Sequence, residues 1–199
     1  VFSADEKMMV SVTCGDADFH ILGLSAGDFP ELPDVEDDYT CTVKQSVLKN
    51  MINGTSFAVS TNESRIVHTG SLFEIENGQL TMVSVDGFRL ALRRENYDKI
   101  EGGAFTFVAP GSALNEVEKV CGDSDEGAMI ILGSRHIQFE VGGTQLICRR
   151  LEGDFLDYKN AIPRQNPILL TADKRALINS IDRVSVVISD KMKSPIRCV

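Results

Sequence analysis

The stretch Thr42–Ser60, TVKQSVLKNMINGTSFAVS, returns 129 residues further along the chain as Thr171–Ser189, TADKRALINSIDRVSVVIS. Aligned without a gap, the two stretches share six identical positions in nineteen, where average residue usage predicts roughly one. A second match, Gly-Asp-Phe at 27–29 and again at 153–155, has nearly the same spacing, 126 residues. Two agreeing spacings predict a repeated domain. We expect one complete copy at 38–163, between parts of two others at 1–33 and 167–199.

A shorter repeat, with a spacing of 66 residues, lies inside the complete copy. Tyr39–Leu48 aligns with Phe105–Leu114, and in each case a short alternating strand leads into a helix of about ten residues. The copy is therefore predicted to consist of two half-units, each of order β-α-β-β-β. That order predicts an α+β fold with antiparallel sheets on one side and two helices on the other.

Turn residues and alternating patterns predict the individual elements. Thr42 and Gln45 have the spacing of a capping box before a helix. The Asn-Gly at 77–78 and the Asp-Gly at 86–87 predict hairpin turns, and Pro110 fits the first turn of a second helix. Strands are expected at 8–14, 19–24, 71–75, 80–85, 88–93, 105–108, 129–132, 137–141 and 145–149, a further helix at 172–187, and linkers at 32–38 and 163–167.

Composition is that of a globular protein, with 43% hydrophobic and 25% charged residues. No run of 18 apolar residues is present, so no membrane partner is expected, and residues 1–6 do not resemble a secretory signal. The five cysteines form no C-x-x-C pair, and Cys14, Cys41 and Cys148 lie in alternating apolar stretches. Buried free thiols in a reducing cytoplasm are therefore expected. The histidines share no ligand spacing, so we expect no metal site and no cofactor.

The net charge of −9 argues against nucleic-acid binding through bulk attraction. A role with DNA would need the basic residues gathered on one face. The common phosphate-binding and nucleophile motifs of enzymes are absent from the sequence. Asp123, Asp125 and Glu126 could hold Mg²⁺ in a hydrolase, although solvated loop carboxylates are the more ordinary interpretation.

Three motifs together resemble one family. Ser84–Ala91, SVDGFRLA, is similar to the A-T-D-G-x-R-L-A of the bacterial DNA polymerase III β subunit, the replicative sliding clamp. Leu151–Tyr158, LEGDFLDY, is similar to that family's L-x-[ED]-G-x-[FY]-P-[DN]-Y, and 26–30, AGDFP, also matches. The motifs occur in the family's order and spacing, and the resemblance extends over essentially all 199 residues. It implies the end of a first clamp domain, a complete second one and the beginning of a third.

The resemblance implies a function without catalysis. Members of the family are processivity factors whose domains form a ring around duplex DNA, with helices lining the hole and sheets outside. The ring is a head-to-tail homodimer that tethers the polymerase III catalytic subunit and also binds the clamp loader and other replication factors. Because ring closure joins the first domain to the third, we expect the chain as given to dimerise poorly. A scaffold of the same fold without a DNA role, or less plausibly the Mg²⁺-dependent hydrolase, remains the alternative.

The DNA-facing residues implied by this arrangement are basic or polar and lie on or beside the helices, on the side away from the apolar stripes. An ordinary solvated helix face would look the same. The second helix, with Glu116 and Glu118, suits the role poorly. The residues are Lys44, Lys49, Asn62, Lys119, Lys174, Arg175 and Arg183.

The resemblance also implies a groove for short partner peptides with apolar tails, between the second and third domains. An apolar pocket with a few polar groups suits a Leu- or Phe-tailed peptide. Val85, Phe88 and His68 depart from the family's usual Thr, His and Leu, so a changed side-chain preference is expected. Carried over by position, the groove residues are Val85, Gly87, Phe88, Arg89, Leu90, Pro163, His68 and Arg65.

Overall fold

The computed structural model describes residues 1–187 and residue 196. The chain divides into two compact units, Val1–Phe155 and Leu156–Val199, which are treated separately below. The end of the predicted long repeat, Ser189, and most of the end of the predicted third domain lie outside the described residues.

The chain opens with a small antiparallel sheet of three strands, β1 (Phe2–Ala4), β2 (Met9–Cys14) and β3 (Ala17–Leu22). The predicted hairpin is confirmed, and Gly15 at its turn has φ +60°, a conformation that glycine adopts without strain. Cys14 is exposed, so the prediction that it is buried was wrong. The alternating pattern of β2 identifies a strand, but Cys14 is its last residue and is exposed, whereas Val10 and Val12 are half-buried.

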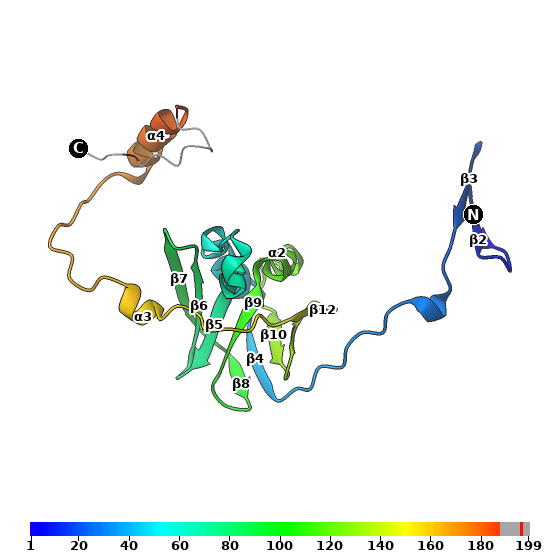
Figure 1. Ribbon diagram of the computed structural model, residues 1–199, viewed down its shortest axis with the longest axis horizontal. Coiled ribbons are helices and arrows are strands. Elements are labelled where there is room, and N and C mark those ends of the chain that lie inside the picture. Colours follow the sequence, from blue (N-terminus) through cyan, green and yellow to red (C-terminus); the bar gives the residue numbers. More distant parts are fainter. Residues whose placement is uncertain (188–195, 197–199) are drawn as a thin grey trace. The chain divides into compact units, whose positions relative to one another are not determined.

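Two sheets and two helices form the centre of the chain (Figure 1). One sheet has the strand order β12-β11-β10-β4-β8 and the other β7-β6-β5-β9. All pairs in them are antiparallel, as predicted. The elements are β4 (Tyr39–Lys44), α1 (Gln45–Asn53), β5 (Gly70–Glu76), β6 (Gln79–Val85), β7 (Leu90–Asn96), β8 (Lys99–Glu101), β9 (Phe105–Pro110), α2 (Gly111–Val120), β10 (Gly127–Leu132), β11 (His136–Val141) and β12 (Thr144–Arg149).

The two predicted half-units are present, and they exchange their first strands. The strands β4 and β9 begin 66 residues apart, as do α1 and α2, which confirms the short repeat. However, β4 pairs with β10 of the second half-unit, and β9 pairs with β5 of the first. The equivalent pairs Lys44↔Gly127 and Pro110↔Gly70 mark the ends of these ladders next to the helices. Neither half-unit can therefore complete its sheet without the other.

The helices cover one face of the sheets and close the hydrophobic core. In Figure 1 the helical segments of the central part gather on one side of the strands. Leu48 and Met51 of α1 and Leu114 of α2 are fully buried among strand residues, each contributing roughly 1.5–3 kcal/mol by burial. Phe73 and Phe107 stack across β5 and β9 with ring centroids 4.8 Å apart. Every residue of this core cluster lies between Cys41 and Cys148.

The predicted capping box at Thr42 is wrong. Thr42 belongs to β4, where it pairs with Met129 on one side and Lys99 on the other. The helix begins at Gln45, and its N-cap residue makes no side-chain hydrogen bond. Since a free helix start needs acceptors for its first amides, the loop 122–126 supplies them instead, as described below.

Other boundaries differ by a few residues. Phe88 lies in the turn before β7 rather than in the strand, and the short edge strand β8 was not predicted. In the second unit a short helix, α3 (Tyr158–Ala161), precedes α4 (Lys174–Ser185), whose start is capped by the Asp173 carboxylate. The start of α4 lies 129 residues after that of α1, the spacing of the long repeat.

Candidate partner groove and nucleic-acid interface

The turn between β6 and β7 is held by one carboxylate. Asp86 Oδ1 accepts hydrogen bonds from the backbone amides of Phe88 (3.0 Å) and Arg89 (3.1 Å), and Oδ2 accepts one from Arg89 Nε (2.9 Å). Gly87 has φ +87°, which this turn requires. Partial burial raises the pKa of Asp86, but these hydrogen bonds and the Arg89 charge outweigh it and hold the pKa below its ordinary value. The turn is therefore fixed with Arg89 in a defined position.

Apolar groups surround this fixed cation. The Phe88 side chain is 86% exposed and that of Phe57 is 57% exposed. The Arg89 guanidinium carbon lies 5.8 Å from the centre of the Phe57 ring, a distance at which a cation is attracted to the ring face. Beneath them Val85 is buried, and it pairs across the ladder with Leu90. The turn thus presents apolar surface with a positive charge held over it.

His68 and Arg65 lie in a helical turn, η3 (Glu63–Thr69), immediately before β5. Because Leu72 pairs with Val83, the beginning of β5 and the end of β6 lie at the same end of the sheet. The His68 ring packs edge-on against Phe155, with centroids 5.3 Å apart. Burial, and then the nearby Arg65 charge, lower the pKa of His68. At neutral pH the imidazole is therefore uncharged.

The structure thus brings together at one end of a sheet most of the predicted groove residues, namely Val85, Gly87, Phe88, Arg89, Leu90, His68 and Arg65. Pro163 follows α3 in the second unit, and its place in the groove stays a prediction. Phe57 and Asp86 were not predicted. The Asp-Gly turn did single out Asp86, but only as a turn residue.

Each predicted DNA-facing lysine on or beside the central helices has an acidic neighbour. Lys44 Nζ lies 3.0 Å from Asp125 Oδ2, and Lys49 Nζ lies 3.0 Å from Asp123 Oδ1. Hydrogen bonds to these carboxylates raise the pKa of both lysines. Lys119 pairs with Glu116 at 2.8 Å.

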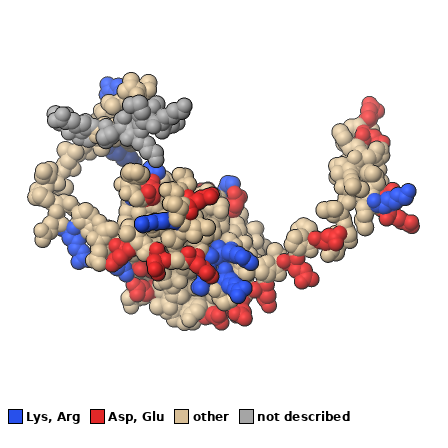
Figure 2. Space-filling view, in the orientation of Figure 1, with Lys and Arg blue, Asp and Glu red and all other residues tan. Residues whose placement is uncertain are grey.

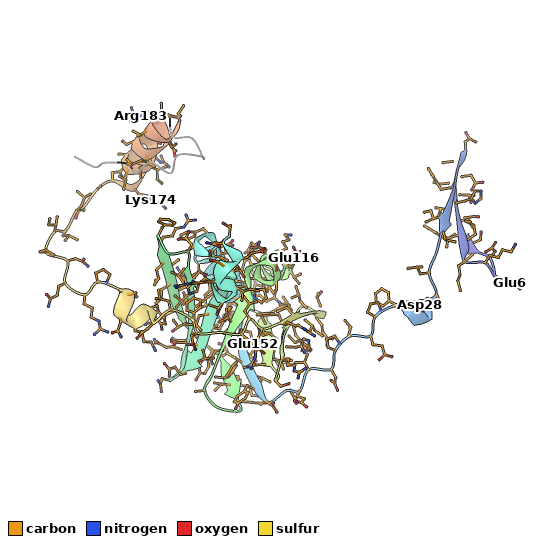
Figure 3. All side chains as sticks on the ribbon, in the orientation of Figure 1. Glu6, Asp28, Glu116, Glu152, Lys174 and Arg183 are labelled. Carbon is orange, nitrogen blue, oxygen red and sulfur yellow. The ribbon has the colours of Figure 1, made fainter. Side chains whose placement is uncertain are left out.

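The other predicted DNA-facing residues have different surroundings. Asn62 uses its side-chain oxygen to accept from the Ser64 amide and so begins η3. Lys174, Arg175 and Arg183 belong to α4 of the second unit (Figure 3 labels Lys174 and Arg183). Arg183 Nε donates to the Asn179 carbonyl at 3.2 Å.

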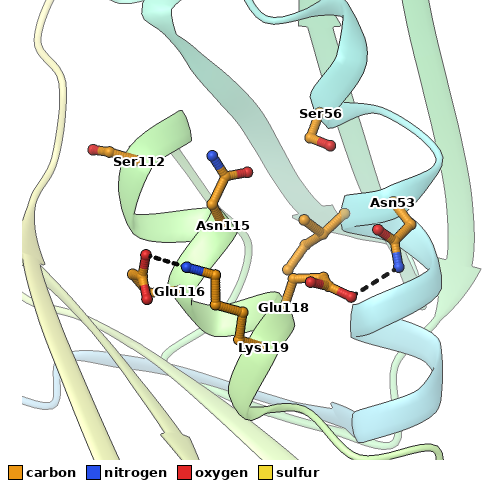
Figure 4. Close-up of a pocket in the computed structure, with 8 residues that line it drawn as sticks. Asn53, Ser56, Ser112, Asn115, Glu116, Glu118 and Lys119 are labelled. Carbon is orange, nitrogen blue, oxygen red and sulfur yellow. Dashed lines mark hydrogen bonds and ion pairs between the residues drawn. The ribbon is translucent and has the colours of Figure 1, made fainter.

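A polar hollow of about 390 Å³ lies between the end of α1 and the outer side of α2 (Figure 4). Asn53 donates across it to Glu118 at 3.2 Å, and Lys119 reaches Glu116. With two carboxylates to one ammonium, the hollow repels phosphate rather than attracts it. This supports the expectation that α2 suits a DNA-facing role poorly. The lining residues are Ile52, Asn53, Ser56, Ser112, Asn115, Glu116, Glu118 and Lys119.

Two arginines outside the predicted set, Arg135 and Arg150, lie next to each other in the described part of the chain. The Arg150 amide donates to the Arg135 carbonyl at 3.1 Å, so the two residues face each other at the end of β11 and β12. Neither forms an ion pair with an acid in the described part of the chain. Figure 2 shows positive and negative side chains interspersed over the visible face of the central part. The sequence carries two consecutive arginines at 149–150, and neither was among the predicted DNA-facing residues.

The three acids that the sequence suggested as Mg²⁺ ligands contact other side chains of the protein instead. Asp123 and Asp125 contact lysines, and Glu126 accepts from the Gln45 side-chain amide at 3.4 Å. Across the described residues, no three His, Cys, Asp or Glu side chains are arranged to hold a metal ion. Cys41 is buried as predicted, whereas Cys148 is half-buried. Burial raises the pKa of Cys41 to about 12 and that of Cys148 to about 11, which keeps both thiols protonated at neutral pH. No helix within 1–187 is both long and apolar enough to cross a membrane.

Exchanged β-α-β-β-β half-units with two helices on one face define a clamp-type α+β domain. Residues 42–157 match the family described as DNA polymerase III beta subunit, central domain. The chain therefore belongs to the DNA polymerase III β subunit family. This agrees with the resemblance carried by the sequence motifs.

Known relatives point the same way. The chain is 30% identical over 181 residues to the beta sliding clamp of Bacillus subtilis, and 34% identical over 185 residues to that of Staphylococcus aureus strain Mu50. These alignments cover 91% and 93% of this chain, which spans about half the length of the relatives, 48% and 49%.

Solved structures of sliding clamps also superpose on the chain. The Bacillus subtilis clamp matches with a TM-score of 0.86 and 28% identity, covering 95% of this chain and 50% of the clamp. The Pseudomonas aeruginosa clamp bound to griselimycin matches with a TM-score of 0.83 and 26% identity, covering 94% and 51%. The predicted clamp fold is confirmed.

Proposed function

We propose that this chain is part of a sliding clamp, a ring that encircles duplex DNA and holds a replicative polymerase on its template. The observation that carries the proposal is the pair of exchanged half-units within a segment that matches the β subunit family. In this proposal the face that carries the helices is turned toward the DNA, with α1 as the contacting helix, and the sheets form the outer surface. The carboxylates of α2 leave that helix with little attraction for phosphate. The protein acts by enclosing DNA and has no catalytic role.

The partners follow from this role. They are duplex DNA without regard to sequence, the polymerase III catalytic subunit, the clamp loader and a second copy of the full-length chain in a head-to-tail dimer. The site of action is the cytoplasm. An enclosed duplex needs only a weakly basic lining, because phosphate contacts that are numerous and strong would hinder sliding. The net charge of −9 is compatible with such a lining.

Processive synthesis is the direct test of this function. Full-length protein is loaded by its own clamp loader onto a long primed circular template, and the product length made by its own polymerase is measured. We expect products to lengthen from short extensions to full template length. Products that stay short, although the protein is shown to be loaded on the template, would contradict the proposal.

We also propose that the turn 86–89 with its surroundings binds the apolar tail of partner peptides. The exposed rings of Phe57 and Phe88 beside the fixed Arg89 support this, because they offer apolar contact with one polar anchor. Phe88 stands where the family usually has His and adds apolar area at the rim. The groove should therefore prefer a peptide whose residue in contact with Phe88 is large and apolar.

Peptide binding to the full-length protein tests the groove. We expect a fluorescent Leu/Phe-tailed peptide to bind saturably, and an Arg89→Ala, Leu90→Ala variant to lose at least tenfold in affinity, since hot-spot truncations cost about 2 kcal/mol or more. Arg94→Ala is a matched control on the same strand, because Arg94 is exposed and lies away from the turn. Equal affinity of the wild type and the double variant would contradict the groove.

A second candidate function is a clamp-fold scaffold that binds proteins but not DNA. The observation in its favour is that Lys44, Lys49 and Lys119 are each paired with an acid. The processivity measurement separates the two functions, because a scaffold would bind the peptide without lengthening the products.

A further inference from the structure

The loop 122–126 is fastened to the beginning of α1 by four hydrogen bonds. The backbone amides of Gln45 and Ser46 donate to the carbonyls of Glu126 (2.8 Å) and Ser124 (3.1 Å). The Gln45 side chain, only 4% exposed, accepts from the Gly122 amide at 2.9 Å and donates to the Glu126 carboxylate at 3.4 Å. The loop thereby satisfies the first amides of the helix. Its position relative to α1 is set by buried and backbone contacts rather than by surface charge.

This attachment places two carboxylates beside Lys44, the residue just before α1, and Lys49, in the middle of α1. Asp125 meets Lys44 and Asp123 meets Lys49, both at 3.0 Å. The carboxylates are 79% and 85% exposed, whereas Lys49 is 24% exposed. The ion pairs therefore lie at the surface, where an incoming anion can reach both lysines. The polar hollow between α1 and α2 adds no free positive charge beside them.

We propose that the loop 122–126 is a built-in competitor of DNA, which holds Lys44 and Lys49 in ion pairs that DNA phosphates must displace. This inference rests on the proposed function, since it requires α1 to face the duplex. Exposed ion pairs are individually weak and screened by salt, so a phosphate can replace each carboxylate at small cost. The loop thus lowers the affinity of α1 for DNA without abolishing it, and weaker contacts favour sliding over fixed binding.

The test compares full-length protein with an Asp123→Asn, Asp125→Asn variant. Both bind a fluorescent duplex, and anisotropy is read over a salt series. Freeing two lysines is expected to tighten binding about threefold to tenfold at low salt and to steepen the slope of log K against log salt by up to about 1.8. In a Lys44→Ala, Lys49→Ala background, the same asparagine changes should have no effect, because the lysines that they release are gone.

A control separates local release from a general change in charge. Glu31→Gln with Asp34→Asn also removes two negative charges, in and just before the predicted linker 32–38, and neither residue pairs with Lys44 or Lys49. This variant should bind DNA like the wild type. A linker variant that tightens binding as much as the loop variant would overturn the inference, since net charge alone would explain the gain.

The remaining outcomes distinguish this inference from the proposed function. If wild-type protein binds DNA and the loop variant binds with the same affinity and salt slope, the competitor role is wrong and the clamp function stands. If the wild type supports processive synthesis but the lysine variant binds DNA unchanged, α1 does not touch DNA and the inference falls. If neither DNA binding nor processivity is found, both proposals fall together.

Discussion

His68 illustrates how a single residue depends on neighbours that are distant in sequence. Its ring packs against Phe155, 87 positions later, while Arg65 lies within its own helical turn. Burial and the Arg65 charge both oppose a second positive charge here and lower the pKa of His68. As a neutral imidazole, His68 is compatible with the proposed apolar groove.

The charge state of His68 can be measured by NMR titration of the full-length protein. We expect a midpoint below 6.5, the ordinary value. Because the folded-state pKa is lowered, the neutral ring stabilises the fold above pH 6.5, and this contribution is lost as the pH falls through the lowered value.

Two variants test the cause of the lowered pKa and the assignment of the resonance. Arg65→Ala should raise the midpoint, yet leave it below 6.5, because burial is the larger cause and persists. His68→Asn should abolish the His68 resonance and so confirm its assignment. A wild-type midpoint at or above 6.5 would refute the described packing.

At the scale of elements, the beginning of α1 shows where local sequence rules fail. Thr42 and Gln45 match a capping box in sequence. In the structure, however, Thr42 pairs with Met129 in the sheet, and the Gln45 side chain is hydrogen-bonded to the loop 122–126. The acceptors for the helix start come from carbonyls about 80 residues away in the chain. By contrast, the equivalent helix α4 follows the local rule, with Asp173 Oδ1 accepting from the Ala176 amide at 2.8 Å.

Gln45→Ala tests the junction between α1 and the loop. It removes two side-chain hydrogen bonds and leaves the Gly122 amide without its partner. We expect a loss of about 1–3 kcal/mol in the free energy of unfolding, measured by urea denaturation.

The neighbouring Ser46→Ala is the matched control, since only the Ser46 backbone takes part in the junction. It should stay within about 0.5 kcal/mol of the wild type. Similar losses for the two variants would mean that the side-chain contacts of Gln45 do not hold the loop.

At the scale of the whole molecule, strand exchange makes the two half-units one cooperative body. Each half-unit contributes its first strand to the sheet of the other, and the core between Cys41 and Cys148 draws on both. The β5–β9 ladder leaves no room for a side chain at Gly70. A Cβ added there would clash with the Ala109 carbonyl oxygen and lie 2.8 Å from Leu151 Cδ1. No residue of the first hairpin belongs to this core cluster.

Residues 38–163 expressed alone are therefore expected to fold. The segment contains every member of the core cluster, and its unfolding should be a single cooperative transition of about 5–15 kcal/mol. Circular dichroism and intrinsic fluorescence during urea denaturation should give coincident curves. A segment that melts without cooperativity, or two separated transitions for 38–104 and 105–163, would contradict the single exchanged body.

The sequence by itself determined most of the long strands and helices, the two repeat spacings and the turn 86–89, because alternation, helical periodicity and turn chemistry are local properties. It did not reveal the short elements β8 and α3. It also identified the family, since the motif around Asp86 and Arg89 is continuous in the chain. Only the tertiary structure decided which strands pair and that Phe57 lies beside Arg89. It also decided that Asp123 and Asp125 form ion pairs with Lys49 and Lys44. Pairing across the half-units joins segments far apart in sequence, and the side-chain contacts that result follow from that packing rather than from any local pattern.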